Sequence, residues 1–163
     1  MAAANIVILV TGANSGIGVE LAAQSMAKGL RPPLAPPLHH QMRDAFDTNA
    51  TGPAVVTIAF VPLLRKPCAS PRIVDISSGI QYRASRAALD MVTACQWAEY
   101  GAAGIKVFAY DPGFTPSHLG PHDTAENGAK PASAAVMPLI DVLQGRRHNE
   151  AGKFLHNTAA YPW

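Results

Sequence analysis

The feature that most constrains this chain is an uncharged stretch near its beginning that leads directly into a glycine-rich turn. Residues 5–10 read NIVILV and are followed by TGANSGIG and then VELAAQSMAKG. A continuous apolar and β-branched run is typical of a strand buried on both faces of a parallel sheet. The third segment has the composition of a helix, and Gly29 stands where that helix would stop. We therefore expect a strand, a glycine turn and a helix in succession.

Further along the chain, strand patterns alternate with helical ones. We predict a strand at residues 72–77, a helix at 82–100 and a strand at 105–110. A helix at 132–144, kinked or broken at its proline, and a short edge strand at 153–156 follow. Strands that alternate with helices predict an α/β fold with a mostly parallel sheet.

A long helix interrupted by prolines is predicted at residues 41–66. Pro53 cannot donate a hydrogen bond to the main-chain carbonyl of Asn49, so we expect that carbonyl to be free and the helix to kink there. The predicted apolar stripe at helical spacing comprises Met42, Phe46, Asn49, Pro53, Val56, Phe60 and either Leu63 or Leu64.

A proline-rich segment, LRPPLAPPLHH at residues 30–40, precedes this long helix. Four of its eleven residues are proline, which excludes a central strand or a helix interior. We predict an extended connector, with His39 and His40 capping or preceding the helix. It is too short to hold a strand–helix–strand unit of roughly 30 residues.

The bulk composition favours a single domain, residues 1–163, that associates with itself. Charged residues make up 15% of the chain, against roughly 25% in an average soluble domain. A surface so poor in charge suggests that part of it is covered, most simply by another copy. The net charge of +2, with no basic cluster beyond Arg146 and Arg147, argues against a nucleic-acid partner.

Cysteine content and the N-terminal segment indicate a cytoplasmic protein. Cys68 and Cys95 are too few for a disulfide framework and suit a reducing compartment. MAAANIVILV has no basic region, and its apolar run is too short for a signal or a membrane segment, so we expect no membrane partner. His118 and His122 lie between prolines, which predicts a solvated loop, and we expect no metal.

The glycines of TGANSGIG stand at positions 12, 16 and 18, between the first strand and the first helix. Glycine permits a tight turn and a close backbone approach, and the helix N-terminus offers N–H groups to a phosphate. The alternative is a tight turn that binds nothing.

Together with SSGIQYRASRAAL at residues 77–89 and DPGFT at 111–115, this turn resembles the short-chain dehydrogenase/reductase family. The motifs occur in the family's order and span nearly the whole chain. The segment from GFTPSHLG to the last residue is similar to that of fungal members.

The resemblance implies a set of site residues. Tyr82 would be the general acid/base and Ser78 would hydrogen-bond the substrate carbonyl. Asn49 would hold a relay water through its main-chain carbonyl, and Arg86 stands where the family has a lysine. A phenol titrates near 10, so a nearby cation is needed to make Tyr82 useful near neutrality. The implied cofactor-binding residues are Gly12, Ser15, Gly16, Ile17 and Gly18 of the glycine loop and Pro112, Gly113 and Thr115 beside the nicotinamide.

Three departures from the family pattern affect this site. The connector replaces strand–helix units, and no acid lies between Glu20 and Asp44 to bind an adenosine ribose. Only three residues separate Ser78 from Tyr82, which places Tyr82 at the start of its helix. Arg86 lies one turn later on the same face and keeps the charge, but it cannot copy the point contact of a lysine.

These departures predict a reduced Rossmann-like α/β sandwich that lacks strands of the family. We expect no cofactor or weak NADP(H) binding, and a dimer or tetramer formed through the helices that carry Asn49 and Tyr82. The first functional hypothesis is a biosynthetic enzyme of secondary metabolism that uses Tyr82 on a carbonyl or phenolic small molecule. Its reaction would be non-redox: isomerase, cyclase, dehydratase or aldol-type lyase. The alternatives are an NADP(H)-dependent ketoreductase, with a partner subunit supplying the missing wall, and a non-catalytic binding or scaffolding protein.

Overall fold

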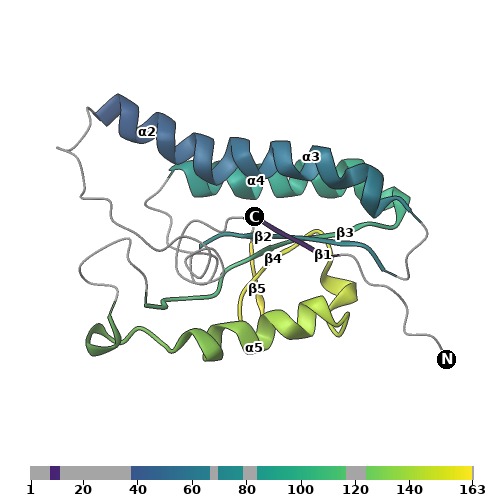
Figure 1. The fold of residues 1–163 in the computed structure, drawn as a ribbon. Helices are drawn as coiled ribbons and strands as arrows, with labels where there is room; N and C mark the ends of the chain where they lie inside the picture. The colour runs from purple at the N-terminus through teal and green to yellow at the C-terminus, as the bar shows by residue number, and fades with distance from the viewer. Residues whose placement is uncertain (1–7, 12–37, 67–69, 79–83, 117–123, 163) are drawn as a thin grey trace.

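The computed structural model describes residues 8–11, 38–66, 70–78, 84–116 and 124–162. A central sheet is covered on one face by three helices, α2, α3 and α4, and on the other by α5 (Figure 1). This three-layer arrangement confirms the predicted α/β sandwich.

The sheet has five strands in the order β1-β2-β3-β4-β5, and only the pairing of β4 with β5 is antiparallel. A mostly parallel sheet was predicted and is confirmed. The strand predicted at 153–156 is not at an edge, because β4 lies between β3 and β5. The two residues of β5 have too short an apolar pattern to be recognised in the sequence. The strands are β1 (Ile8–Thr11), β2 (Arg72–Ile76), β3 (Lys106–Tyr110), β4 (Phe154–Leu155) and β5 (Ala160–Tyr161).

The helices predicted in the described part of the chain are present, with one corrected boundary, while the helix predicted directly after the glycine turn lies outside that part. Residues 38–40 belong to α2, so the predicted connector is wrong at its end; residues 30–37 lie outside the described part. The last proline of the segment is Pro37, and every later residue there carries the N–H that a helix needs. The helices are α2 (Leu38–Phe46), α3 (Gly52–Leu64), α4 (Ala84–Tyr100) and α5 (Ala132–Leu143), with short 3₁₀ turns at Gly101–Ala103, Ala125–Asn127 and His148–Glu150.

A π-helical turn, Asp47–Thr51, joins α2 to α3 directly before Pro53. The Gly52 N–H donates to the Asp47 carbonyl, five residues back, in place of the usual four. The predicted irregularity ahead of Pro53 is therefore present as a widened turn. Asn49 and Ala50 on this turn are both buried.

The buried stripe of α3 differs from the predicted one. Because α3 is apolar on all sides, hydrophobicity did not indicate which face meets the sheet, and the widened turn changes the phase of the stripe. The prediction was right for Asn49 and Pro53, and for the choice between Leu63 and Leu64, of which Leu64 is buried. It was wrong for Met42, Val56 and Phe60, whose side chains are exposed. The buried stripe comprises Asn49, Pro53, Thr57, Val61 and Leu64.

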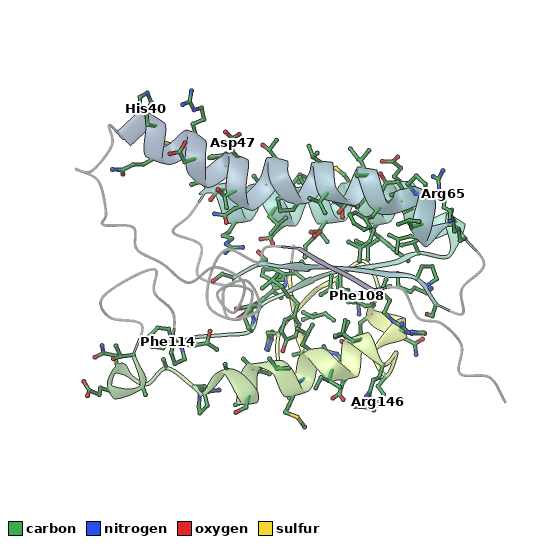
Figure 2. The ribbon with its side chains drawn as sticks, in the orientation of Figure 1. His40, Asp47, Arg65, Phe108, Phe114 and Arg146 are labelled. Carbon is green, nitrogen blue, oxygen red and sulfur yellow. The ribbon has the colours of Figure 1, made fainter. Side chains whose placement is uncertain are left out.

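Both faces of the central strands are apolar. Ile73 and Val107 point towards α3 and α4, while Val74 and Phe108 point towards α5. Figure 2 shows Phe108 between the sheet and α5. Burial on both faces explains the continuous apolar runs in the sequence. Among the described residues, no helix combines the length and apolarity needed to span a bilayer.

We expect Thr93→Val to destabilise the protein by about 1–3 kcal/mol. The Thr93 hydroxyl donates to the Asp75 carboxylate over 2.7 Å, and both side chains are fully buried. Valine keeps the shape but removes the hydrogen-bond donor to the buried Asp75 carboxyl group. Urea unfolding measures the change, with the exposed Thr51→Val as control because Thr51 makes no side-chain cap. Equal effects of the two substitutions would contradict this account.

Candidate active site

Polar residues gather where β2 and β3 end, at the carboxyl edge of the sheet. Ser77 directly follows β2, and its N–H donates to the Tyr110 carbonyl over 2.8 Å. Asp111 directly follows β3, and its N–H donates to the Leu155 carbonyl over 2.8 Å. In open α/β sheets, ligands bind outside the carboxyl ends of the strands. This edge is therefore the candidate active site.

The structure places only part of the predicted site. Asn49, Ser78 and Arg86 lie in the described part of the chain, as do Pro112, Gly113 and Thr115. The remaining predicted residues lie outside it: Tyr82, Gly12, Ser15, Gly16, Ile17 and Gly18. Their roles stay predictions.

Asn49 is brought against the beginning of α4. Its side chain is buried, and its Nδ2 donates to the Ser85 hydroxyl over 3.0 Å. Its Oδ1 atom is also buried and has no hydrogen-bond partner among the described residues. The π-helical turn therefore places Asn49 next to the residue that precedes Arg86. The predicted water-binding role of the Asn49 main-chain carbonyl stays a prediction.

Arg86 is held at the end of β2. Its guanidinium is buried, and Nη1 donates to the Ile76 carbonyl over 2.7 Å. Arginine offers several donors in a rigid fork, so one nitrogen can bind the strand while the positive charge stays at the site. Arg86 thus supplies a fixed positive charge at the carbonyl of Ile76, which precedes Ser78 by two residues. Its predicted action on Tyr82 is untested.

Asp90 is a site residue that the sequence analysis missed. The Ser77 hydroxyl donates to its carboxylate over 2.5 Å. Burial raises the pKa of Asp90, and the Ser77 hydrogen bond and the Arg86 charge only partly offset this; Asp111 and Asp75 raise the pKa further. The available signal was its position four residues after Arg86 on one helix face. That spacing is equally common on solvated helices.

The loop after β3 has a fixed conformation. Gly113 has φ of 76°, a left-handed value that glycine adopts readily, and its N–H donates to the Asp111 carboxylate over 2.8 Å. Pro112 and Thr115 are half-buried, while Phe114 is exposed beyond the end of β3 (Figure 2). The predicted nicotinamide segment therefore lies at the same edge as Ser78.

No group of three potential metal ligands occurs among the residues that the structure describes. His118 and His122 lie outside that part of the chain.

Comparison with known proteins identifies relatives of this chain, although no protein-family model matches it. The short-chain dehydrogenase/reductase tropE of Talaromyces stipitatus is 28% identical over 151 residues, covering 70% of this chain and 56% of tropE. The short-chain dehydrogenase anuI of Penicillium roqueforti is 30% identical, covering 61% of this chain and 49% of anuI.

Solved structures agree with these relatives. The NADPH-bound carbonyl reductase from chicken fatty liver has a TM-score of 0.64 at 25% identity and covers 84% of this chain and 64% of its own. The chain is similar to members of the short-chain dehydrogenase/reductase family. A gluconate 5-dehydrogenase from Burkholderia cenocepacia, solved with NADP and tartrate, has a TM-score of 0.67 at 19% identity, covering 91% of this chain and 62% of its own. That second likeness shows the Rossmann-like fold.

The chain is shorter than these relatives. The chain spans about half the length of the two fungal relatives. The alignment with tropE is 151 positions long, but it covers only 70% of this 163-residue chain. Some of the aligned tropE residues are therefore internal residues that have no counterpart in this chain. The predicted internal shortening agrees with this alignment.

The described residues fit only part of a dinucleotide site. Rossmann-like folds bind dinucleotides across the crevice where the strand order reverses. Here β1 pairs only with β2 among the described strands, and the order β1-β2-β3-β4-β5 contains no reversal. The loop after β3 suits the nicotinamide half, but the order of the described strands offers no crevice for the adenosine half.

Asp90→Asn is expected to stabilise the protein at neutral pH, with the advantage disappearing in acid. Because burial raises the pKa of Asp90, its ionised form is disfavoured in the folded state. Protonated Asp90 contributes its full stabilisation at pH values below the pKa of Asp90 in the unfolded chain. This stabilisation is lost as the pH rises through the higher pKa of Asp90 in the folded protein. Asparagine is neutral throughout and keeps an acceptor for Ser77.

Urea unfolding at several pH values measures this difference, and Asp44→Asn on the exposed surface of α2 is the control. A wild-type protein more stable than the Asp90 variant at neutral pH would contradict the expected sign.

Proposed function

We propose that this chain is an enzyme that moves protons on a small carbonyl or phenolic metabolite without hydride transfer. The observation that carries the proposal is the strand order in the described part of the chain: polar residues lie at the carboxyl edge of β2 and β3, but among the described strands the order does not reverse beside β1. The acid/base half of a short-chain dehydrogenase site is thus better supported than its dinucleotide half.

The chemistry proposed for this edge is redox-neutral. Tyr82, which precedes α4 by two positions in the sequence, would exchange a proton with the substrate oxygen while Ser78 hydrogen-bonds that oxygen. The charge of Arg86, held by the Ile76 carbonyl, favours the phenolate of a nearby tyrosine. In an isomerisation the proton leaves the carbon beside a carbonyl and returns to another atom. Atoms and electrons therefore balance without an oxidant.

An NADP(H)-dependent ketoreductase is the second candidate. It is favoured by the names of the fungal relatives and by the NADPH-bound chicken carbonyl reductase. In this case Pro112, Gly113 and Thr115 would face the nicotinamide, and a partner subunit would complete the adenosine side. The nucleotide would bring hydride to the substrate.

An NADPH titration separates the two candidates. We expect no saturable change in NADPH fluorescence, because the order of the described strands supplies no crevice for the adenosine half. Saturable binding at micromolar concentrations would overturn the first proposal in favour of the ketoreductase.

Turnover of small carbonyl and phenolic compounds, followed by NMR without nucleotide, tests the acid/base residue. Tyr82→Phe should lower the rate about a hundredfold or more, the range for loss of a general acid/base. Tyr100→Phe, at the far end of α4, is the control. Equal turnover in wild type and Tyr82→Phe would contradict the mechanism, and inactivity together with a stable protein complex would favour a scaffolding role.

We also propose that a second copy covers the outer face of α3. Val55, Ile58 and Phe60 are 60%, 64% and 43% exposed, which is unusual for large apolar side chains of one helix. Met91 on α4 is 64% exposed as well. These helices carry the Asn49 turn and follow Tyr82, so the interface would lie beside the candidate site.

Ile58→Glu should therefore shift the protein towards monomer, because it places a charge in the covered face. Analytical ultracentrifugation measures the assembly. Met137→Glu is the matched control, since Met137 is 65% exposed on α5, across the sheet. The proposal would be wrong if wild type were monomeric or if both variants dissociated alike.

A further inference from the structure

A tyrosine near the C-terminus reaches the candidate active site from β5. The Tyr161 hydroxyl donates to Oδ2 of Asp111 over 3.1 Å. Oδ1 of the same carboxylate accepts the Gly113 N–H over 2.8 Å. Asp111 is buried, with 5% of its surface exposed. One carboxylate thus joins the last strand to the loop that follows β3.

That loop is held at two points. Its first half depends on the Asp111 carboxylate, which holds the left-handed Gly113. Its second half is held by the Phe114 carbonyl, which accepts the Lys130 N–H over 2.9 Å. Rotation of the Asp111 side chain would break its hydrogen bond to Gly113 and leave the Phe114–Lys130 hydrogen bond intact. The direction of that carboxylate therefore controls the hydrogen bond that holds the first half of the loop.

The Tyr161 ring is itself fixed by its neighbours. Tyr161 lies opposite Phe154 in the β4–β5 pair, and the two ring centroids are 4.9 Å apart. The His156 ring lies on it at 4.5 Å. Burial and the Asp111 charge raise the pKa of Tyr161, so its hydroxyl stays protonated and remains a donor.

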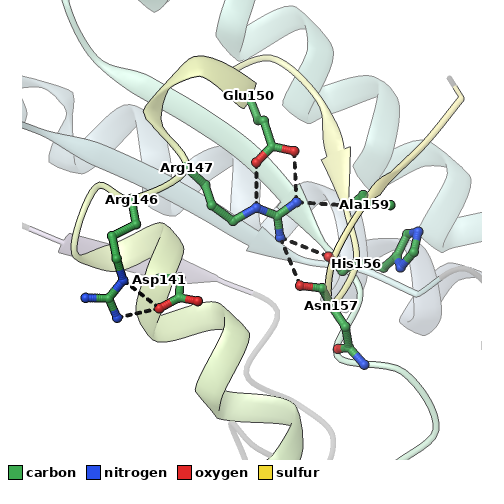
Figure 3. A network of polar contacts seen from close by, with 7 residues as sticks. All are labelled: Asp141, Arg146, Arg147, Glu150, His156, Asn157 and Ala159. Carbon is green, nitrogen blue, oxygen red and sulfur yellow. Dashed lines mark hydrogen bonds and ion pairs between the residues drawn. The ribbon is translucent and has the colours of Figure 1, made fainter.

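Arg147 fixes the turn that connects β4 to β5 (Figure 3). Its guanidinium donates to the carbonyls of His156, Asn157 and Ala159 at 2.9, 3.4 and 3.1 Å. The same group forms a two-pronged ion pair with Glu150 at 2.6 and 2.9 Å. The hydrogen bond from Arg147 lowers the pKa of Glu150, so the pair stays charged at neutral pH. This clamp holds the strand that carries Tyr161 in register.

We propose that Tyr161 is a positioning residue of the candidate active site, which acts through Asp111 to hold the Pro112–Thr115 loop in its ligand-facing conformation. The inference rests on the proposed function only in placing the site at the carboxyl edge of β2 and β3. It applies equally whether the loop faces a substrate or a nicotinamide. The C-terminal hairpin thereby becomes part of the site although it is remote from it in sequence.

The test compares Tyr161→Phe with Tyr110→Phe by NMR of the full chain. Both substitutions remove one tyrosine hydroxyl bond of 3.1 Å, but Tyr110 donates to the Ala135 carbonyl on α5. We expect the Gly113 amide to exchange with solvent roughly three- to tenfold faster in the Tyr161 variant, the factor for about one hydrogen bond. Tyr110→Phe should leave that amide unchanged.

An unchanged Gly113 amide in Tyr161→Phe, or equal changes in the two variants, would overturn the proposal. A double-mutant cycle identifies the carboxylate as the link: with Asp111→Ala already present, Tyr161→Phe should have no further effect on Gly113. An additional effect in that background would show that Tyr161 acts by another route.

The amide measurement needs no ligand, so it can fail or succeed independently of the proposed function. Where turnover is found, Tyr161→Phe should raise KM more than it lowers kcat, because the loop binds and orients. A loss of kcat with KM unchanged would contradict a positioning role. Faster Gly113 exchange in Tyr161→Phe together with absent turnover would reject the proposed function and leave this inference standing.

Discussion

Three hydrogen bonds between α4 and the carboxyl half of β2 hold the rest of this structure together. Arg86 donates to the Ile76 carbonyl, Ser77 donates to Asp90, and Thr93 donates to Asp75. Together they place successive turns of α4 against the strand. The apolar layer of α3 and α4 alone would allow the helix to slide, because dispersion and hydrophobic burial are not directional. The polar contacts set its position.

The position of α4 determines that of the site. The beginning of α4 lies beside the end of β2, and the π-helical turn of Asn49 reaches it through Ser85. The loop after β3 begins at the same edge, because β2 and β3 are parallel and in register, with Ile76 opposite Tyr110. The C-terminal hairpin then reaches that loop through Tyr161 and Asp111. Four segments distant in sequence thus meet at one edge.

The local elements were predictable because each carries its own pattern. The apolar runs at 72–77 and 105–110 marked β2 and β3, and Pro53 marked an irregular turn. The buried face of α3 was not predictable, since all its faces are apolar. The interior position of β4 was also missed, because β5 is two residues long and is held by main-chain pairing and by Arg147.

The order of amino acids was sufficient to establish the α/β class, the family resemblance and the residue types of an acid/base site. These depend on local periodicity and on short motifs. The contacts of Asp90, Asp111 and Tyr161 depend on the tertiary structure. Asp90 lies 13 residues from its partner Ser77, and Tyr161 lies 50 residues from its partner Asp111. No spacing rule joins residues so far apart. Only the packing of α4 on the sheet and the return of the C-terminal hairpin bring these groups together.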